Sequence, residues 1–213
     1  MHLIHRGIVN KKYQENLLKS FKLAFKKGYG VETDIHSTKD HKFVCYHDFT
    51  LNRIFKKKQS IKYLTYQKIK EISHGNKKPI PLLNELLKAS KNQHFLFIEI
   101  KPNFSPELLR KLVKETSKYS KCVFISFKHQ NILNLLKINK KIKVGLSFSP
   151  PASVKSIIMK SKIKNINYLI LDKFYLKNKK IQTIKIQKYF YTIKKKSEFN
   201  KYKMKNNLIF ENL

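Results

Sequence analysis

The stretch Phe95-Leu-Phe-Ile-Glu-Ile-Lys101 is an apolar run that ends in a carboxylate and an ammonium group. Its length and its β-branched and aromatic residues predict a buried strand. A similar run, Val31–Ile35, carries Glu32 and Asp34. Such runs recur along the chain, and the stretches between them have apolar residues at three- and four-residue spacing, which indicates amphipathic helices. Strand alternating with helix predicts a parallel sheet.

Eight strands can be assigned in this way, and eight strand-and-helix units favour a closed (β/α)8 barrel, the α/β fold known as the TIM barrel. No Gly/Ser-rich or Pro-rich linker divides the chain, so residues 1–213 are expected to form a single domain. The predicted strands are His2–His5, Val31–Ile35, Phe95–Ile100, Cys122–Ser126, Val144–Ser147, Tyr168–Leu171, Tyr189–Thr192 and Leu208–Phe210. The predicted outer helices are Glu15–Lys27, Pro81–Ser90, Pro106–Tyr119, Gln130–Lys137, Ala152–Lys160, Leu176–Ile184 and Ser197–Lys205.

The predicted barrel is irregular in two places. Between the second and third strands the chain is too long for one helix, so an insertion is expected at about residues 43–79. It includes an extended run at Phe43–Tyr46 and a small helix near Tyr66–Ile72. After the last strand only Glu211-Asn212-Leu213 remain, so no C-terminal eighth helix is expected. The barrel should then expose an apolar strip beside its first and last strands, a candidate contact for a homodimer.

The composition is strongly basic, with 47 Lys+Arg against 13 Asp+Glu and a formal charge of +34, while 41% hydrophobic residues suffice for a folded core. A charge of this size suggests nucleic-acid binding. Arginine occurs only at Arg6, Arg53 and Arg110, however, and the excess is diffuse lysine, so no dedicated nucleic-acid partner is expected. A weak, salt-dependent attraction to anionic membranes remains an expectation.

No apolar run approaches the ~20 residues of a membrane span, and the first residues lack the pattern of a secretory leader, so a cytoplasmic location is expected. Cys45 and Cys122 each lie in an apolar run. This position suits buried thiols better than a disulfide or a zinc site.

Three carboxylates stand out because acidic residues are scarce. Glu32 and Asp34 are two residues apart on one predicted strand, so both point to the same face. Glu99 and Lys101 repeat this two-residue spacing at the end of the next strand. Carboxylates inside apolar parallel strands are costly to desolvate unless a cation holds them together. Oxygen ligands of this kind predict one hard divalent ion, Mg²⁺ or Ca²⁺, with Mn²⁺ as a further option.

Other polar groups follow the ends of the same strands, where TIM barrels form their active sites. His5 ends the first strand and His47 follows the extended run after Asp34, and two imidazoles near a metal cluster suit general acid–base catalysis. Arg6 and Lys101 supply positive charge without binding a metal, so they are expected to hold an oxyanion such as a phosphate. Together these groups predict phosphoester chemistry.

The residues named above belong to a longer series of motifs: His5-Arg6-Gly7, Glu15-Asn16, Glu32-Thr-Asp34, Thr38-Lys39-Asp40, His47-Asp48-Phe-Thr-Leu-Asn-Arg53, Ile80-Pro81-Leu-Leu-Asn-Glu85-Leu-Leu87 and Ile98-Glu99-Ile-Lys101-Pro102, with Ser126-Phe127 extending it. In order and spacing, this series resembles the glycerophosphodiester phosphodiesterase family across about half of the chain.

The resemblance implies a (β/α)8 barrel with an insertion after the second strand. It also implies that Glu32, Asp34 and Glu99 bind the metal and that His5 and His47 are the catalytic acid–base pair. Phosphate contacts are implied for two further residues, Arg6 and Lys101. The implied reaction converts a glycerophosphodiester into an alcohol and glycerol 3-phosphate.

The chain departs from the family pattern at the rim. Gln14 and Leu17 flank Glu15-Asn16 where the family has Pro and Thr, and His41 stands where it favours Gly. A family Trp-Thr pair is replaced by Tyr191-Thr192, and a final Thr-Asp by Phe210-Glu211. These changes affect substrate fit more than the metal and histidine core.

Two alternative functions stay open. One is a phosphodiesterase of the lysophospholipase D type acting on membrane lipids, which the basic surface would favour. The other is a catalytically inactive basic protein that binds nucleic acid or anionic membrane. Choline release from glycerophosphocholine and from lysophosphatidylcholine separates the two enzymes. Strong, salt-dependent DNA binding together with no metal-dependent hydrolysis would favour the binding protein.

Overall fold

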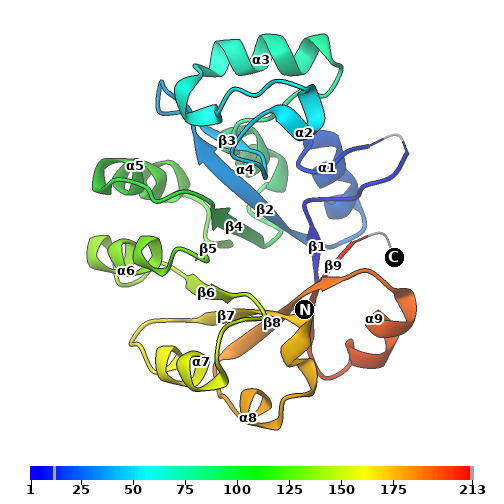
Figure 1. Ribbon diagram of the computed structural model, residues 1–213, viewed down its shortest axis with the longest axis vertical. Helices are drawn as coiled ribbons and strands as arrows, with labels where there is room; N and C mark the ends of the chain where they lie inside the picture. Colours follow the sequence, from blue (N-terminus) through cyan, green and yellow to red (C-terminus); the bar gives the residue numbers. More distant parts are fainter. Residues whose placement is uncertain (12, 212–213) are drawn as a thin grey trace.

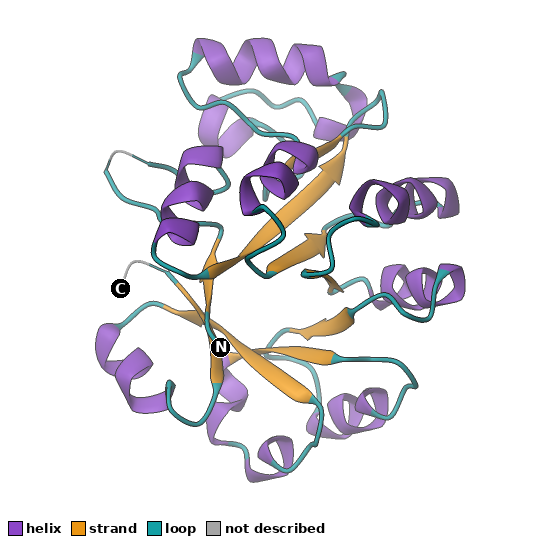
Figure 2. Ribbon diagram, turned by 180° about the vertical axis from the view of Figure 1, so that it is seen from behind, coloured by secondary structure: helices purple, strands orange, loops and turns teal. Residues whose placement is uncertain are grey.

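A ring of eight parallel strands dominates the computed structural model, which describes residues 1–11 and 13–211 (Figures 1 and 2). The ring runs β1-β2-β4-β5-β6-β7-β8-β9 and closes where β9 pairs with β1, and the helices lie outside it. The predicted TIM barrel is therefore confirmed. The strands are β1 (Leu3–His5), β2 (Gly30–Ser37), β3 (Phe43–Cys45), β4 (Leu96–Ile100), β5 (Cys122–Ser126), β6 (Val144–Phe148), β7 (Tyr168–Asp172), β8 (Gln187–Ile193) and β9 (Asn207–Phe210).

Most helices coincide with the amphipathic stretches seen in the sequence. They are α1 (Leu18–Lys26), α2 (Asn52–Phe55), α3 (Tyr66–Gly75), α4 (Leu83–Ser90), α5 (Pro106–Thr116), α6 (His129–Ile138), α7 (Val154–Ser161), α8 (Lys179–Gln182) and α9 (Lys196–Tyr202), with 3-10 helices η1 (Ile61–Tyr63) and η2 (Lys173–Lys177). The predicted continuous helix Leu176–Ile184 is wrong. Asn178 is extended there and its side chain accepts a bond from the Ile181 amide, so it starts a new helix and separates η2 from α8.

The barrel interior is filled by side chains from alternate strand positions. They form one apolar cluster, which consists of Leu3, Phe97, Val123, Ile125, Ile170, Tyr189 and Ile209. A larger apolar cluster lies between the strands and the outer helices. Because side chains fill the interior, a substrate can reach the barrel only through the loops at its rim. Cys45 and Cys122 are buried free thiols, as predicted.

The insertion after β2 brings the chain back across the barrel mouth. Strand β3 runs antiparallel to β2, and α2, η1 and α3 cover it at the top of Figure 1. The insertion has its own apolar cluster, which includes Val44, Leu51 and Ile69. The Tyr46 amide donates to the Asp34 carbonyl at 3.0 Å. This bond places the next residue, His47, directly beside β2.

The barrel wall is thin between α1 and α9. Strand β9 ends at Phe210, and no helix follows it within the described part of the chain, of which Glu211 is the last residue. A groove of about 350 Å³ lies there, with Ile4, Phe199 and Phe210 at its base and lysines at its edge. The apolar strip expected from the sequence is thus partly covered by α9, and its use in a homodimer stays a prediction. Among the described residues, none of the helices is long and apolar enough to cross a membrane.

Candidate active site

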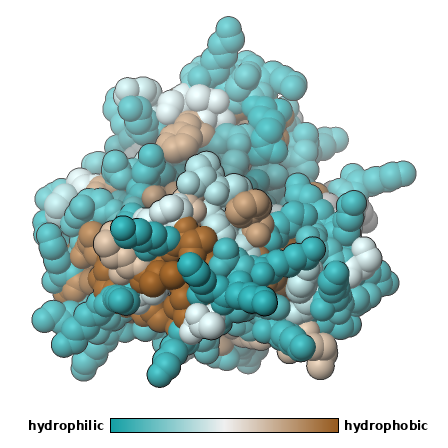
Figure 3. Space-filling view, turned by 60° about the horizontal axis from the view of Figure 1, so that its bottom comes forward, coloured by the Kyte–Doolittle hydropathy of each residue, from teal (hydrophilic) through white to brown (hydrophobic). Residues whose placement is uncertain are grey.

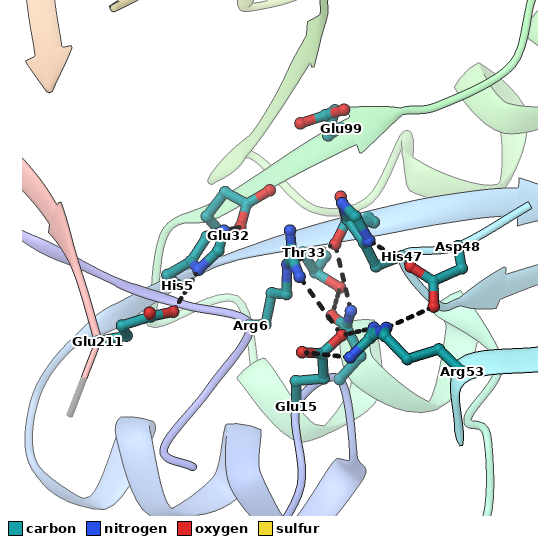
Figure 4. Close-up of polar contacts among 12 residues, drawn as sticks. His5, Arg6, Glu15, Glu32, Thr33, His47, Asp48, Arg53, Glu99 and Glu211 are labelled. Atoms are coloured by element: carbon teal, nitrogen blue, oxygen red, sulfur yellow. Dashed lines mark hydrogen bonds and ion pairs between the residues drawn. The ribbon is translucent and has the colours of Figure 1, made fainter. Parts of the chain in front are cut away.

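Strand register explains why residues far apart in the sequence meet at one end of the barrel. In the paired strands His5 of β1 lies opposite Glu32 of β2, and Asp34 of β2 lies opposite Glu99 of β4. All four side chains alternate inward, so they converge at one end of the barrel. Figure 4 shows three of them, His5, Glu32 and Glu99, on neighbouring strands. The two-residue spacing seen in the sequence therefore becomes a three-strand cluster.

The three predicted metal ligands form a compact buried cluster. One carboxylate oxygen from each of Glu32, Asp34 and Glu99 lies within 4.8 Å of the other two. Glu32 Oε2 and Asp34 Oδ1 are buried and make no hydrogen bond. Buried oxygen atoms of this kind are rare without a partner. The donor set is all oxygen, so it fits a hard divalent cation.

The electrostatics of the cluster agree with a missing positive charge. Burial, together with the charges of Asp34 and Glu99, raises the pKa of Glu32 well above its ordinary value. Burial and the neighbouring Asp34 raise the pKa of Glu99 to about 7. Burial alone would raise the pKa of Asp34, but Arg6 and Lys101 outweigh it and hold that pKa below its usual value. Two cations face three carboxylates, so one negative charge is left for an ion.

The two cations predicted to hold phosphate lie against this cluster. Arg6 Nε is 3.0 Å from Asp34 Oδ2, and Lys101 Nζ is 2.8 Å from Glu99 Oε1 and 3.4 Å from Asp34 Oδ1. Both side chains also line the pocket above the cluster. The Arg6 and Lys101 side chains therefore stabilise the buried carboxylates and are also exposed to the pocket.

A tight turn after β1 positions Arg6. Its backbone is left-handed, with φ +56°, and Gly7 follows with φ +80°. A Cβ atom on Gly7 would lie 2.8 Å from the Ser20 carbonyl carbon, so only glycine fits. The Arg6 amide donates to the Glu32 carbonyl at 2.8 Å, which ties the turn to the strand that carries the metal ligands.

Each predicted catalytic histidine has a carboxylate partner on Nδ1. His5 Nδ1 lies 2.9 Å from Glu211 Oε2, and His47 Nδ1 lies 2.6 Å from Asp48 Oδ1 (Figure 4). These bonds leave Nε2 as the ring nitrogen available for a substrate. His5 Nε2 is 3.7 Å from Glu32 Oε2, so this ring stands at the edge of the carboxylate cluster.

The two histidine–carboxylate pairs, His5–Glu211 and His47–Asp48, have different charged neighbours. The bond from His5 and a 2.7 Å contact with Lys194 lower the pKa of Glu211 to about 2. Burial lowers the pKa of His47, partly offset by the charge of Asp34. Asp48 also receives a bond from Arg53 Nε at 2.6 Å. Both carboxylates therefore stay ionised and can hold an imidazolium.

Glu15 and Asn16, which sequence reasoning leaves as the start of a helix, belong to the polar network of the site. Arg53 and Arg6 both bond to the Glu15 carboxylate, at 2.5 Å and 3.3 Å. The buried Asn16 side chain donates to Asp34 Oδ2 at 3.2 Å and accepts from the Thr33 hydroxyl. The sequence indicated a functional role for Glu15 and Asn16 only through their place in the motif that resembles the family. It did not show which side chains they contact.

A pocket of about 440 Å³ opens above the cluster and has two unlike halves. The β9, β1, β2 and β4 side carries most of the charged groups, including six of the seven predicted site residues, and Lys194 after β8 is charged as well. The seventh, Asp34, lies beneath the pocket with 1% of its surface exposed. The β5, β7 and β8 side presents Ile125, Phe127, Ile170 and Tyr191. The Tyr191 hydroxyl donates to the Phe148 carbonyl at 2.9 Å, so its ring forms a fixed wall.

A comparison with protein families matches residues 5–204 to the glycerophosphoryl diester phosphodiesterase family. A glycerophosphodiester phosphodiesterase of Caldanaerobacter subterraneus subsp. tengcongensis is 31% identical over 160 residues, which cover 68% of this chain and 65% of that protein. A glycerophosphodiester phosphodiesterase of Bacillus altitudinis is 34% identical over 107 residues, which cover 46% of this chain and 43% of that protein. The matched regions thus span less than two thirds of both curated relatives.

Solved structures agree in fold. The glycerophosphodiester phosphodiesterase of Thermotoga maritima superposes with a TM-score of 0.82 at 24% identity, covering 98% of this chain and 92% of that one. A phosphodiesterase of Oleispira antarctica, solved in complex with the product sn-glycerol-3-phosphate, superposes with a TM-score of 0.85 at 20% identity. That alignment covers 99% of this chain and 92% of the relative.

Proposed function

Because this chain belongs to the glycerophosphoryl diester phosphodiesterase family, we propose that it hydrolyses glycerophosphodiesters to an alcohol and glycerol 3-phosphate. The observation that carries the proposal is one pocket in which a buried trio of carboxylates lies beside two histidines, each held by its own carboxylate. The product bound by the Oleispira antarctica relative is the one that this reaction would release.

Glu32, Asp34 and Glu99 would hold one divalent cation, Mg²⁺ or Ca²⁺, with Mn²⁺ as a further option. The two buried carboxylate oxygens without a hydrogen-bond partner support this assignment. When bound, such an ion polarises the phosphate and stabilises the charge that develops on it. With the carboxylates holding such an ion, Arg6 and Lys101 would direct their charge to the phosphate oxygens.

His5 and His47 would move the protons. One imidazole takes a proton from the nucleophile, which is water or the glycerol hydroxyl next to the ester, and the other gives a proton to the departing alkoxide. If the glycerol hydroxyl attacks, water then opens the resulting cyclic phosphate and the two rings exchange roles. Glu211 and Asp48 would stabilise whichever ring becomes an imidazolium.

Release of glycerol 3-phosphate, coupled to its dehydrogenase, tests the proposal. We expect activity with glycerophosphocholine or glycerophosphoethanolamine that needs Mg²⁺ or Ca²⁺ and is lost with a chelator. His5→Ala and Glu99→Ala should each abolish most of it. If neither the chelator nor the substitutions change the rate, the site assignment is wrong.

The apolar half of the pocket favours a second candidate substrate, a lysophospholipid. Ile125, Phe127 and Ile170 offer no hydrogen bonds to a glycerol group, whereas they can contact an acyl chain. In that case choline would be released faster from lysophosphatidylcholine than from glycerophosphocholine. The inactive nucleic-acid binder has less support, because Arg6, Arg53 and Arg110 are all in ion pairs with carboxylates.

A further inference from the structure

Exposed phenylalanines gather at one end of the barrel. Of the 15 phenylalanines in the sequence, those exposed among the described residues are Phe49, Phe127 and Phe174, at 52%, 38% and 71%. Phe127 follows the carboxyl end of β5, and Phe174 lies just beyond the end of β7. Phe49 lies two residues after His47, which lines the pocket at the same mouth. Exposed apolar residues scattered singly are ordinary, but three rings around one opening are not.

Hydrogen bonds of the neighbouring residues order the segment that carries Phe174. Phe174 is followed by Tyr175, which is buried and whose hydroxyl lies within hydrogen-bond distance of the carbonyls of Ser149, Pro150 and Ala152. The Asp172 side chain accepts a bond from the Phe174 amide at 2.8 Å. Phe174 is therefore exposed on an ordered 3-10 helix, although exposing an apolar ring to water is unfavourable in free energy.

Positive charge surrounds the rings. Exposed lysines at this rim include Lys128 next to Phe127, Lys177 at the end of η2, and the run Lys194–Lys196 after β8. Of the nearby acidic side chains, Glu198 bonds to Lys173 at 2.9 Å, Glu211 bonds to Lys194 at 2.7 Å, and Asp172 accepts a bond from the Phe174 amide. The rim thus presents apolar rings among more lysines than carboxylates.

An aliphatic groove includes Asn178, which directly follows η2, in its lining. It runs between α7 and α8, which start on the same side of the barrel as η2, and Val154, Ile158 and Met159 form its floor. Lysines at its edges come from both helices. On the face that carries α7, α8 and α9, apolar side chains form one area surrounded by hydrophilic ones (Figure 3).

We propose that the mouth of the barrel docks on anionic phospholipid bilayers, with Phe127 and Phe174 in the headgroup region and the rim lysines against lipid phosphates. Aromatic rings next to lysines are the composition of interfacial membrane-binding surfaces. A second copy of the chain is a poor occupant, because each copy carries +34. Single-stranded nucleic acid is less suited than lipid, since the aliphatic side chains of the groove cannot stack on bases.

The docked orientation faces the active-site pocket toward the bilayer. That this delivers a lipid-linked phosphodiester rests on the proposed function, whereas docking itself needs no turnover. Vesicle binding is measured separately from turnover. A protein that hydrolyses soluble glycerophosphocholine without binding vesicles would contradict docking alone, and one that binds vesicles without hydrolysis would contradict the proposed function alone.

A tryptophan reporter tests the orientation, because the chain contains no Trp. Phe174→Trp places the only indole at the rim, and Met204→Trp places it at the opposite end, where Met204 is 85% exposed before β9. With vesicles of equal phosphatidylcholine and phosphatidylglycerol, we expect a blue shift and quenching by brominated lipid at position 174 only. No shift at 174, or an equal shift at both positions, overturns the proposal.

A second pair of variants measures affinity. Phe174→Ser should lower vesicle partitioning about tenfold or more, as expected for withholding one phenyl ring from an apolar phase, and Met204→Ser should change it less than about twofold. Both variants should keep the wild-type circular dichroism spectrum and the wild-type rate on soluble glycerophosphocholine. Equal partitioning of the two variants would show diffuse lysine attraction, and a loss of oligonucleotide binding instead of vesicle binding would assign the rim to nucleic acid; either result overturns the proposal.

Discussion

The two halves of the active-site pocket are built from adjacent arcs of the same barrel, yet they differ in almost every physical respect. The arc β9-β1-β2-β4 carries three buried carboxylates, two histidines and two cations. The arc from β5 to β8 presents apolar and aromatic walls to the same space. The polar arc is dense because like charges in a low dielectric need opposite charges within a few ångströms. The apolar arc has no such requirement, so it can set the shape of the pocket.

This contrast predicts that chemistry and substrate choice separate along the barrel. Substitutions on the polar arc should act on kcat and on metal binding. Substitutions on the apolar arc should act on KM and on preference between substrates.

The largest expected effect is on the polar arc. His47→Ala should lower kcat/KM for glycerophosphocholine at least about a hundredfold, the lower range for a positioned acid or base. Tyr191→Phe, on the opposite wall, keeps the ring and removes only the hydroxyl bonded to the Phe148 carbonyl, so its loss should stay under about tenfold. Both rates are measured by glycerol 3-phosphate release. Comparable losses would erase the distinction between the two arcs.

The carboxylates behind the histidines should matter next. Asp48→Asn keeps the shape but weakens the bond to His47 Nδ1, and we expect kcat to fall about 10- to 100-fold through misorientation of the ring. Because the Asp48 bond raises the pKa of His47, its removal should also move the corresponding limb of the kcat–pH profile to lower pH.

A matched control for that variant is Glu198→Gln. Glu198 pairs with Lys173 at the rim of the other arc and touches neither histidine. Its kcat should stay within about twofold, with an unmoved pH profile. A profile that shifts for both variants would mean that general loss of charge, and not orientation of His47, causes the effect.

Metal binding should depend on pH through Glu99. Its pKa of about 7 means that below this pH an incoming ion displaces a proton, so apparent affinity should fall by up to about tenfold per pH unit below 7. Displacement of a proton from Glu32, whose pKa is also raised, adds to this dependence. Titration with Mg²⁺ or Ca²⁺ by calorimetry at pH 5.5 to 8 measures the slope.

The same group links pH to stability of the metal-free protein. A folded pKa above the unfolded value of about 4.5 means that the folded state binds the extra proton. Its stabilising contribution is therefore present at low pH and is lost as pH rises toward about 7. The rise in Tm on adding the ion should then be larger at pH 8 than at pH 5.5. Glu99→Gln should flatten this difference, and an unchanged difference would contradict the assignment.

The smallest expected effect lies on the apolar arc. Tyr191→Ala opens the wall that Tyr191 forms with the Phe127 ring, whose centroid is 5.9 Å away. The ratio of kcat/KM for lysophosphatidylcholine to that for glycerophosphocholine should change by up to about tenfold, the range for one altered apolar contact. The rate of choline release from each substrate gives this ratio. A loss of kcat for both substrates alike would place Tyr191 with the polar arc.

Local periodicity was sufficient to predict the barrel. The strand stretches around Val31–Ile35 and Phe95–Ile100 differ from β2 and β4 by only a few residues at the ends. The insertion was predicted as a unit, but α2 and η1 within it were not, because helices of one turn have no measurable apolar period. The split between η2 and α8 was missed for a similar reason, since it depends on one capping side chain.

The sequence by itself determined which side chains share a face, because alternation along a strand places Glu32 with Asp34 and Phe97 with Glu99 whatever else the chain does. Only the tertiary structure decided which of them have partners. Glu211 reaches His5 across 206 residues, and Arg53 reaches Glu15 across 38. The first contact exists because the ring closes and brings the last strand beside the first, and the second because β1 pairs with β2, after which the insertion that carries Arg53 begins. No local pattern of residues encodes distances that are set by the arrangement of the whole barrel.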